Sequence, residues 1–362
     1  MKNILGNHLT LTLFGESHGK YVGAVLDGLA PGLEVNEEFI SHQLTLRRPE
    51  GNISTSRVEK DPFEIASGVF KGFTTGTPLT IIIPNGDTRS DDYEPRAARP
   101  SHADYAAHLK YHGFEDYRGG GHFSGRITSA IVAAAAIIIY ALRKKGVYIA
   151  THIKHIAGIY DRDFDDISRD IDILSTKVFA ALDEEKASLM REEILKAKAD
   201  GDSVGGVLES IITGLPGGLG EPYFDSVESL LAHAIFSVPA VKGVEFGDGF
   251  DIAKMRGSAA NDAMANVDGK IALSSLHSGG IYGGITVGEN ILIRTAIKPT
   301  PTIGKNQNTI NIPDLENTTL QGKGRHDPCI VQRARVVIDS VIALTLADIL
   351  TGRFGTDWMA EK

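Results

Sequence analysis

Three short loops of the chain each place a proton-transfer group beside a glycine or a proline, with a cationic side chain close by. They are LFGESHGKYVG (13–23), RPSHADY (99–105) and GRHDPC (324–329). A histidine that titrates near neutrality can donate a proton to a leaving group, and the planar fork of arginine suits a phosphate or a carboxylate. A single loop histidine is often only a hydrogen-bonded bystander, but three such loops together indicate acid–base chemistry on an anionic substrate.

The first loop is close to a phosphate-binding P-loop but has the wrong spacing. A P-loop needs G-x-x-x-x-G-K followed by Ser or Thr, so that backbone N–H groups wrap the anion. Here Gly15 and Gly19 stand one residue too close, and Tyr21 follows Lys20. We therefore do not expect a nucleotide triphosphatase. Two interpretations of His18 remain, an acid that takes part in chemistry and a residue that only packs.

The charge distribution indicates a small anionic ligand. The chain of 362 residues is 42% hydrophobic and 23% charged, with a formal net charge of −9. This charge argues against general binding to nucleic acid or to an anionic membrane. Eight arginines nevertheless fall between residues 47 and 126, and seven of the twelve histidines precede residue 123. We expect an arginine- and histidine-rich pocket within an acidic protein.

Cysteine content and hydropathy exclude further classes. The single cysteine, Cys329, rules out an internal disulfide framework and a multi-cysteine zinc site, and we expect no metal. The N-terminus shows no apolar signal core, and the apolar run at 127–142 is too short and too alanine-rich to predict a membrane span. The sequence therefore predicts a cytoplasmic protein that binds neither membrane nor nucleic acid.

Helices and short strands must position the three loops. Segments that are apolar on every side predict buried helices at 127–142 and 334–352. Alternating apolar residues predict strands within 22–29, 79–85, 206–215 and 285–297. This pattern predicts an α+β fold in which helices pack between antiparallel sheets. No strand–GxGxxG–helix unit supports a Rossmann dinucleotide site.

The chain also carries an internal echo. GAVLDGLAPGLEV (23–35) is similar to GGVLESIITGLPGGLGEP (205–222), and each is followed later by a glycine- and arginine-bearing loop and a long apolar helix. We interpret this as an internal duplication with pseudo-twofold symmetry. The expected organisation is a single domain over 1–362, with halves of about 1–150 and 200–362 and a charged helical insertion at about 177–203.

The loop motifs together resemble one family. GESHG, LRRP, RPSHADY, YRGGG followed by SGR, HSGGIYGGIT, KPT and KGRHDPC occur in the order and spacing of chorismate synthase, from about residue 5 to about residue 350. The resemblance implies the layered β-α-β sandwich of that family. It also implies a carbon–oxygen lyase that converts 5-enolpyruvylshikimate-3-phosphate into chorismate, the last step of the shikimate pathway and a step towards the aromatic amino acids. This anti-1,4-elimination of phosphate and a C6 hydrogen requires reduced FMN, with no net redox change.

The resemblance assigns roles to individual positions. His18 would protonate the departing phosphate, His102 would stabilise the reduced flavin, and Asp327 with Ser17 and Ser124 would relay protons. The substrate's anionic groups would be bound by Arg47, Arg48, Arg99, Arg126 and Arg325, of which Arg47 also matches an NADP-binding position. FMN would contact His122, Phe123, Ser124, Pro239, Ala240, Gly283, Lys298, Pro299, Thr300, Pro301, Thr302 and Arg325.

The chain departs from the common family pattern at His122-Phe123, where many members have Arg-Ser. This removes one cation and one hydroxyl from the loop that would face the flavin. The resemblance further implies a homotetramer in which NADPH acts indirectly by reducing the flavin, and the compact chain favours an external flavin reductase. Two rival interpretations of the same residues stay open: a histidine-assisted phosphatase that needs no flavin, and a flavin- or anion-binding module without turnover.

Overall fold

Two long apolar helices form the centre of the molecule. The computed structural model describes residues 3–55, 60–86, 97–322 and 327–360. Helices α3 (Thr128–Lys144) and α8 (Val331–Phe354) pack side by side. Both expected helices are confirmed, and α8 begins at Val331 rather than at residue 334. The alanines of α3 let α8 approach closely, and residues 130–138 are all buried.

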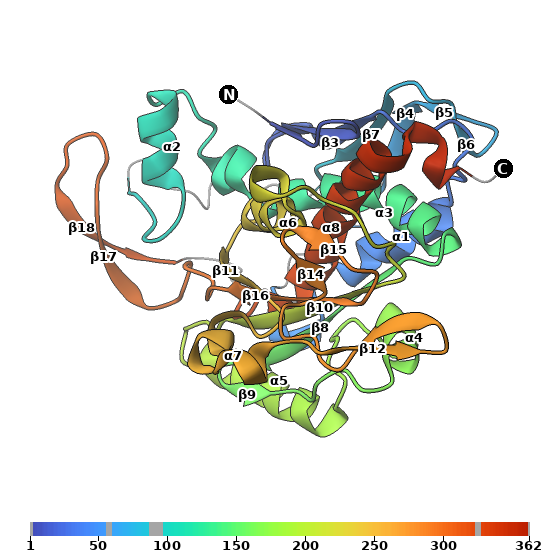
Figure 1. The fold of residues 1–362 in the computed structure, drawn as a ribbon. Coiled ribbons are helices and arrows are strands. Elements are labelled where there is room, and N and C mark those ends of the chain that lie inside the picture. The colour runs from blue at the N-terminus through green and yellow to red at the C-terminus, as the bar shows by residue number, and fades with distance from the viewer. Residues whose placement is uncertain (1–2, 56–59, 87–96, 323–326, 361–362) are drawn as a thin grey trace.

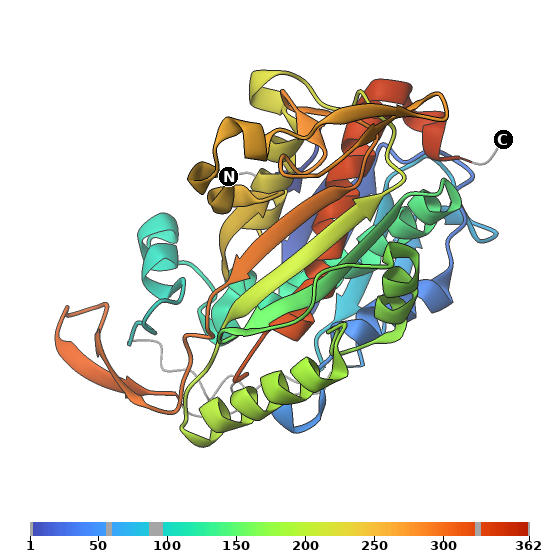
Figure 2. The same cartoon turned by 60° about the horizontal axis from the view of Figure 1, so that its bottom comes forward.

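A five-stranded antiparallel sheet covers each side of this helix pair, so the layers run sheet, helices, sheet. Figure 2 shows the second sheet in front of α8 and the first sheet behind it. The first sheet has the spatial order β1 (Ile4–Leu5), β2 (Thr10–Gly15), β3 (Tyr21–Asp27), β7 (Leu79–Pro84) and β4 (Glu64–Ser67). The second has the order β9 (Ile159–Tyr160), β8 (Tyr148–Ile156), β10 (Gly206–Thr213), β16 (Ile291–Ile297) and β11 (Val241–Phe246). The expected α+β class, with helices between antiparallel sheets, is confirmed.

The two sheets have the same topology. Apart from the edge strands β1 and β9, the strands that come first, second, fourth and third along the chain lie side by side in each sheet: β2, β3, β7 and β4 in one, and β8, β10, β16 and β11 in the other. Helix α1 (Glu37–Leu46) packs on α3 as α6 (Val227–Phe236) packs on α8. This matching order is what an internal duplication produces. We propose a single domain over 1–362 in which the second half begins at β8, near residue 148, and not near residue 200.

The remaining elements decorate the sandwich. The other helices are α2 (Asp104–Tyr111), α4 (Ile167–Thr176), α5 (Glu184–Ala199) and α7 (Gly257–Ala260). Four two-stranded hairpins pair β5 (Val69–Phe70) with β6 (Phe73–Thr74), β12 (Met264–Val267) with β13 (Lys270–Leu273), β14 (Ile281–Tyr282) with β15 (Ile285–Thr286), and β17 (Asn306–Ile310) with β18 (Asn317–Gln321). Short 3-10 helices occur at η1 (Gly51–Ile53), η3 (Arg118–Phe123), η4 (Gly125–Ile127), η5 (Tyr223–Asp225), η6 (Gly249–Lys254) and η7 (Thr356–Met359). The β17–β18 hairpin and α2 both stand away from the sandwich on the same flank (Figure 1).

The predicted strand at 285–297 is wrong in one respect, because it is divided in two. β15 ends at Thr286 and β16 begins at Ile291. Gly288 lies between them with a φ of +86°, a left-handed conformation that interrupts a strand and favours glycine. The charged helix expected within about 177–203 is present as α5, and α4 precedes it in the connection between β8 and β10.

One stretch of the described chain is long and apolar enough to cross a membrane. It covers Gly125–Lys144, has a mean hydropathy of 1.9, and 89% of it is buried inside the fold. The same stretch contributes α3, which lies between the two sheets (Figure 1). Its apolar character is therefore accounted for by the protein core.

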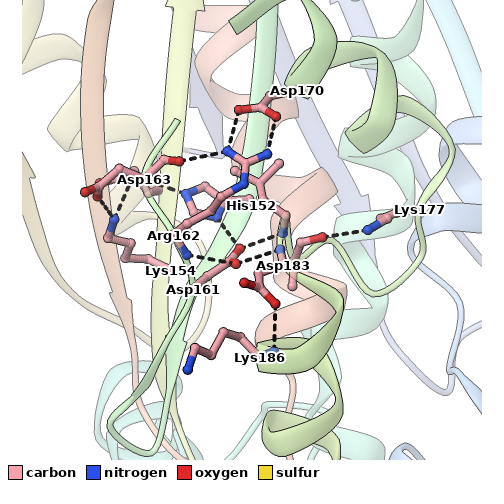
Figure 3. A network of polar contacts seen from close by, with 12 residues as sticks. His152, Lys154, Asp161, Arg162, Asp163, Asp170, Lys177, Asp183 and Lys186 are labelled. Atoms are coloured by element: carbon pink, nitrogen blue, oxygen red, sulfur yellow. Dashed lines mark hydrogen bonds and ion pairs between the residues drawn. The ribbon is translucent and has the colours of Figure 1, made fainter. Parts of the chain in front are cut away.

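A buried cluster of charges lies on the outer face of the second sheet, beneath the connection that carries α4 (Figure 3). His152 on β8 is fully buried, and its ring nitrogens are hydrogen-bonded to Asp161 at 2.8 Å and to Glu209 on β10 at 3.1 Å. Glu209 also pairs with Arg294 on β16 at 2.7 Å. Burial opposes protonation of His152, but the two carboxylates outweigh it and raise the pKa of the imidazole. The two carboxylates therefore favour the protonated form of His152.

Candidate active site

Two adjoining cavities open where the loops of both halves meet. The first has a volume of about 900 Å³ and the second about 770 Å³, a size typical of small-molecule sites. Both are lined by Arg99, His122, Phe123, Thr300 and Asp327, so they form one composite cleft. We call the first the His18 cavity and the second the His102 cavity, because each of these predicted catalytic histidines lines only that one.

The loop that carries His18 is the hairpin turn between β2 and β3. It is a strand–turn–strand connection, whereas a P-loop leads from a strand into a helix. A Cβ atom at Gly119 would lie 2.2 Å from Nδ1 and Cε1 of His18, and Gly119 has a φ of +61°. Only glycine can therefore stand here, and its backbone packs directly on the imidazole. The backbone N–H of Ser17 donates to the carbonyl of Gly121 at 3.1 Å, which fixes the turn to the glycine loop.

His102 lies in the second cavity, just before α2. Its Nε2 is hydrogen-bonded to the hydroxyl of Thr302 at 2.6 Å. Burial, followed by the positive charges of Arg99 and Lys298, lowers the pKa of His102 to about 4, although Asp104 acts in the opposite direction. The imidazole is thus neutral at pH 7. In this state it can offer a hydrogen bond but not a positive charge.

Asp327 lies just before α8 and faces both cavities. Its carboxylate accepts a hydrogen bond from the backbone N–H of Thr55 at 2.8 Å and forms an ion pair with Arg333. The Nε of Arg333 donates to the carbonyl of Arg47 at 3.1 Å. Asp327 is therefore held in place by two different parts of the chain, even though its side chain lines the cleft.

The arginines predicted to bind substrate line the same cleft, and several are anchored by protein groups. Arg126 is buried and donates to Asn85 at 2.8 Å, to the carbonyl of Pro84 at 3.0 Å and to the carboxylate of Asp61. The other oxygen of Asp61 lies 3.6 Å from Arg47. Asp61 is itself buried, so one carboxylate holds two guanidinium groups together at the wall of the His102 cavity.

Arg99 and Arg48 are anchored differently. Arg99 forms a bidentate pair with Asp104, at 2.8 and 2.7 Å. Arg48 donates to the carbonyl of Lys60. Four of the five predicted arginines therefore contribute to the cleft, and Arg325 lies outside the described residues.

The glycine loop at 119–121 closes the cleft between the two histidines. All three glycines have positive φ angles, of +61°, +82° and +53°. Nδ1 of His122 donates to the carbonyl of Gly15 at 2.8 Å, which ties this loop to β2. Phe123 lies edge-on to Tyr111 with ring centroids 6.1 Å apart, and Ser124 caps η4 by accepting from the N–H of Arg126 at 3.3 Å. The loop thus presents an aromatic ring and backbone groups to both cavities.

Similarity to known proteins covers almost the whole chain. Residues 9–351 match the family model described as chorismate synthase. The chorismate synthase of Korarchaeum cryptofilum is 46% identical over 96% of this chain and 96% of its own length, and that of Archaeoglobus fulgidus is 44% identical over 96% and 97%. A solved structure titled "Crystal Structure of Chorismate Synthase" superposes with a TM-score of 0.77 and 29% identity, over 98% of this chain and 95% of the other.

The chain belongs to the chorismate synthase family. It is therefore an enzyme, a lyase of the shikimate pathway, and the family resemblance and fold expected from the motifs are confirmed. The family implies a small-molecule substrate and a requirement for reduced flavin.

The chorismate synthase residues expected at the flavin site are distributed unevenly. Several line the cleft, namely His122, Phe123, Ser124, Pro239, Ala240, Lys298, Thr300, Pro301 and Thr302. Pro299 is exposed and lines neither cavity. Gly283 lies in the turn between β14 and β15 and also lines neither cavity.

Two buried hydroxyl groups near the cleft have no hydrogen-bond partner among the described residues. They are Oγ1 of Thr300 and Oγ of Ser17. Such groups are costly to bury unless something else bonds to them. Lys298 donates to the carbonyl of Ser101 at 2.7 Å, and burial together with neighbouring Lys242 lowers its pKa. A planar cofactor that carries a phosphate would suit this site. The free hydroxyl groups could bond to it, the neighbouring cations Lys298 and Lys242 could face its phosphate, and the Phe123 ring could lie against its plane.

The sequence did not single out three residues that organise the site, Asp61, Asn85 and Arg333. Each contacts a predicted site residue: Asp61 and Asn85 bind Arg126, and Arg333 binds Asp327. The contacts that join Arg126 to Asn85 and Asp61 span 41 and 65 positions of the chain. The only local signal is that Asn85 directly follows a predicted strand, where polar residues enter a loop.

Proposed function

We propose that the cleft catalyses the anti-1,4-elimination of phosphate and a C6 hydrogen from 5-enolpyruvylshikimate-3-phosphate, giving chorismate. The observation that carries this proposal is the convergence of His18, His102 and Asp327. They come from three distant loops and line two adjoining cavities together with arginines. The substrate carries one phosphate and two carboxylates, which is the ligand that such a cationic lining suits.

The arginines would bind the substrate's anionic groups. Arg48 and Arg99 line the His102 cavity, and the latter also lines the His18 cavity. Arg47 and Arg126 reinforce that wall while sharing Asp61. A hydrogen bond between charged groups contributes roughly 1.5–3 kcal/mol, so losing one arginine should weaken substrate binding by about one to two powers of ten.

His18 would act as the acid for the departing phosphate. Its imidazole lies in a turn that has no room to shift, because Gly119 packs against the ring. A fixed acid within reach of the leaving group lowers the barrier by removing the cost of orientation. Asp327, with Ser17 and Ser124, would relay the proton that leaves the substrate, and Arg333 keeps the carboxylate aimed at both cavities.

Reduced FMN, when bound, would supply the electron chemistry of the elimination, with no net redox change. Thr300, Thr302, Phe123 and Lys298 are the residues that would hold it, with Lys298 facing its phosphate. His102 would contribute a neutral N–H donor to the cofactor, since its pKa of about 4 leaves it uncharged at pH 7. Replacement of the common Arg-Ser by His122-Phe123 leaves backbone and aromatic contacts where a cation would otherwise stand.

We propose four further properties. The enzyme would work in the cytoplasm as a homotetramer. NADPH would supply reducing equivalents indirectly, through a separate flavin reductase. Arg47 would be the residue that contacts NADP, although it already donates to Thr128 at 2.9 Å and to the carbonyl of Gly125 at 2.7 Å and lies 3.6 Å from Asp61. Sedimentation analysis tests the homotetramer. An NADPH oxidation assay with and without an added reductase tests whether flavin reduction needs a second protein.

An anaerobic assay tests the proposed reaction. The purified protein is incubated with 5-enolpyruvylshikimate-3-phosphate, with and without reduced FMN, and both phosphate and chorismate are measured. We expect equal amounts of both products, and only with the flavin. Phosphate release without flavin would instead indicate a phosphatase, and no release in either arm would indicate a binding module. His18→Ala and His102→Ala should each lower turnover by roughly 10²–10⁴-fold, and wild-type turnover would remove that histidine from the mechanism.

A further inference from the structure

Asn85 makes an unusual number of contacts with the turn that carries His18. It directly follows β7, and its backbone N–H donates to the carbonyl of Lys20 at 3.1 Å. Its side-chain Nδ2 donates to the carbonyls of Glu16 and Gly19, at 2.9 and 2.8 Å. The three carbonyls that bracket Ser17 and His18 are thus all bonded to one residue. Both amide hydrogens of Asn85 are used on this turn.

The turn is also held by its own backbone and by the glycine loop. Its own backbone contributes one bond, from the N–H of Gly19 to the carbonyl of Glu16 at 3.1 Å. On the opposite side the glycine loop packs on the imidazole and accepts the N–H of Ser17. The turn is therefore clamped between Asn85 and the glycine loop, and the direction of the His18 ring depends on both.

The remaining polar atom of Asn85 reaches the other cavity. Its Oδ1 accepts a hydrogen bond from Nε of Arg126 at 2.8 Å, and Arg126 in turn pairs with Asp61. One carboxamide thus connects the turn at the His18 cavity with a guanidinium of the His102 cavity. Aspartate could not replace it, because it would keep the acceptor for Arg126 but lose both donors and place a carboxylate against two carbonyl oxygens.

We propose that Asn85 is a positioning residue that orients His18 through the turn and ties it to Arg126. The inference rests on the proposed role of His18 as the acid. It predicts that Asn85 matters for turnover only while His18 is present to be oriented. A merely structural residue would matter equally in either background.

A double-mutant cycle tests this dependence. The kcat for chorismate formation with reduced FMN is measured for the wild type, Asn85→Asp, His18→Ala and the double variant. Misplacement of a catalytic group by about 1 Å costs on the order of 10²-fold, so Asn85→Asp should lower kcat by roughly 10- to 100-fold in the wild-type background. In the His18→Ala background it should cost less than about threefold, and KM should change little in both.

The controls separate the possible failures. Asn317→Asp makes the same chemical change on the exposed strand β18 and should leave kcat unchanged. Asn85→Ala adds no charge beside the carbonyls, so it provides the same cycle if Asn85→Asp does not fold. Equal losses in both backgrounds, or wild-type kcat for both Asn85 variants, would overturn the role of Asn85 alone. Wild-type turnover of His18→Ala would instead overturn the proposed acid, and this inference with it.

Discussion

Replacing His152 with glutamine should lower the free energy of unfolding strongly, although this residue lines neither cavity of the cleft. The imidazole and the Asp161 side chain are fully buried, and Glu209 is nearly so. Glutamine has a similar length but no charge, and its amide donates from one end only, whereas the imidazolium donates to the two carboxylates from opposite sides of its ring. The substitution therefore removes the charged partner that Asp161 and Glu209 have in common, and both carboxylates stay buried.

The size of the effect follows from what each carboxylate retains. Removing one partner of a buried ion pair costs about 3–5 kcal/mol. Glu209 keeps Arg294 at 2.7 Å and Lys154 at 3.3 Å, and Asp161 keeps the backbone N–H groups of Leu182 and Asp183. These remaining partners place the loss at the lower end. We expect the free energy of unfolding to fall by about 3 kcal/mol.

The loss should depend on pH in a defined direction. Because the pKa of His152 is raised above its ordinary value of 6.5, its contribution is complete below about pH 6.5 and is lost as pH rises through the higher folded pKa. Burial alone would raise the pKa of Glu209, but the hydrogen bonds of His152 and Arg294 outweigh it and lower that pKa from 4.5 to about 2. The contribution of Glu209 is therefore present above about pH 4.5 and is lost as pH falls towards 2. The difference between the wild type and the variant should be largest between these limits.

Urea unfolding at pH 5.5 and at pH 9, followed by circular dichroism, measures this difference. His233→Gln is the matched control, because His233 is exposed on α6, and it should change the free energy of unfolding by less than about 0.5 kcal/mol. The reasoning is refuted if His152→Gln costs under about 1 kcal/mol at pH 5.5, or if its cost is the same at both pH values.

Three further predictions concern other parts of the molecule. Gly119→Ala would place a Cβ 2.2 Å from the His18 ring at a φ of +61°, so kcat should fall by roughly 10²-fold, whereas Gly257→Ala, where nothing lies within 4 Å of the added Cβ, should be active. The pKa of about 4 for His102 means that its ring nitrogens should keep neutral-tautomer ¹⁵N chemical shifts at pH 6, and imidazolium shifts there would contradict the burial argument. Burial raises the pKa of the Cys329 thiol to about 12, so the native protein should not react with a thiol reagent at pH 8 while the urea-unfolded protein reacts within minutes; rapid reaction of the native protein would show that the thiol is accessible.

The two central helices and the strands β3, β7, β10 and β16 could be predicted from the sequence, because their apolar patterns match their burial. The run that became α3 is apolar all round and is buried all round. Residues 79–83 alternate, and Leu79, Ile81 and Ile83 face the core. The family could also be predicted, because its loop motifs are long and unusual and occur in this chain in the expected order and spacing.

What the sequence could not give depends on contacts between distant segments. β8 pairs with β10, but α4 and α5 lie between them in the chain, so this pairing was not evident. Asp61 and Asn85 read as ordinary loop residues, and their importance appears only when Arg126 lies beside them. His152 stands on the polar side of an alternating strand, which predicts exposure to solvent, yet the connection that carries α4 covers it.

Because α3 packs against α8, the core cannot be completed until the ribosome has synthesised both helices. A ribosome adds about 5–20 residues per second, and nearly two hundred residues separate these helices. For roughly 10 to 40 s, a nascent chain therefore holds the long apolar helix α3 without the helix that packs against it. During that interval the alanine-rich surface is available to a chaperone or to another unfinished chain. Arrival of α8 ends this exposure and unites both sheets around one core.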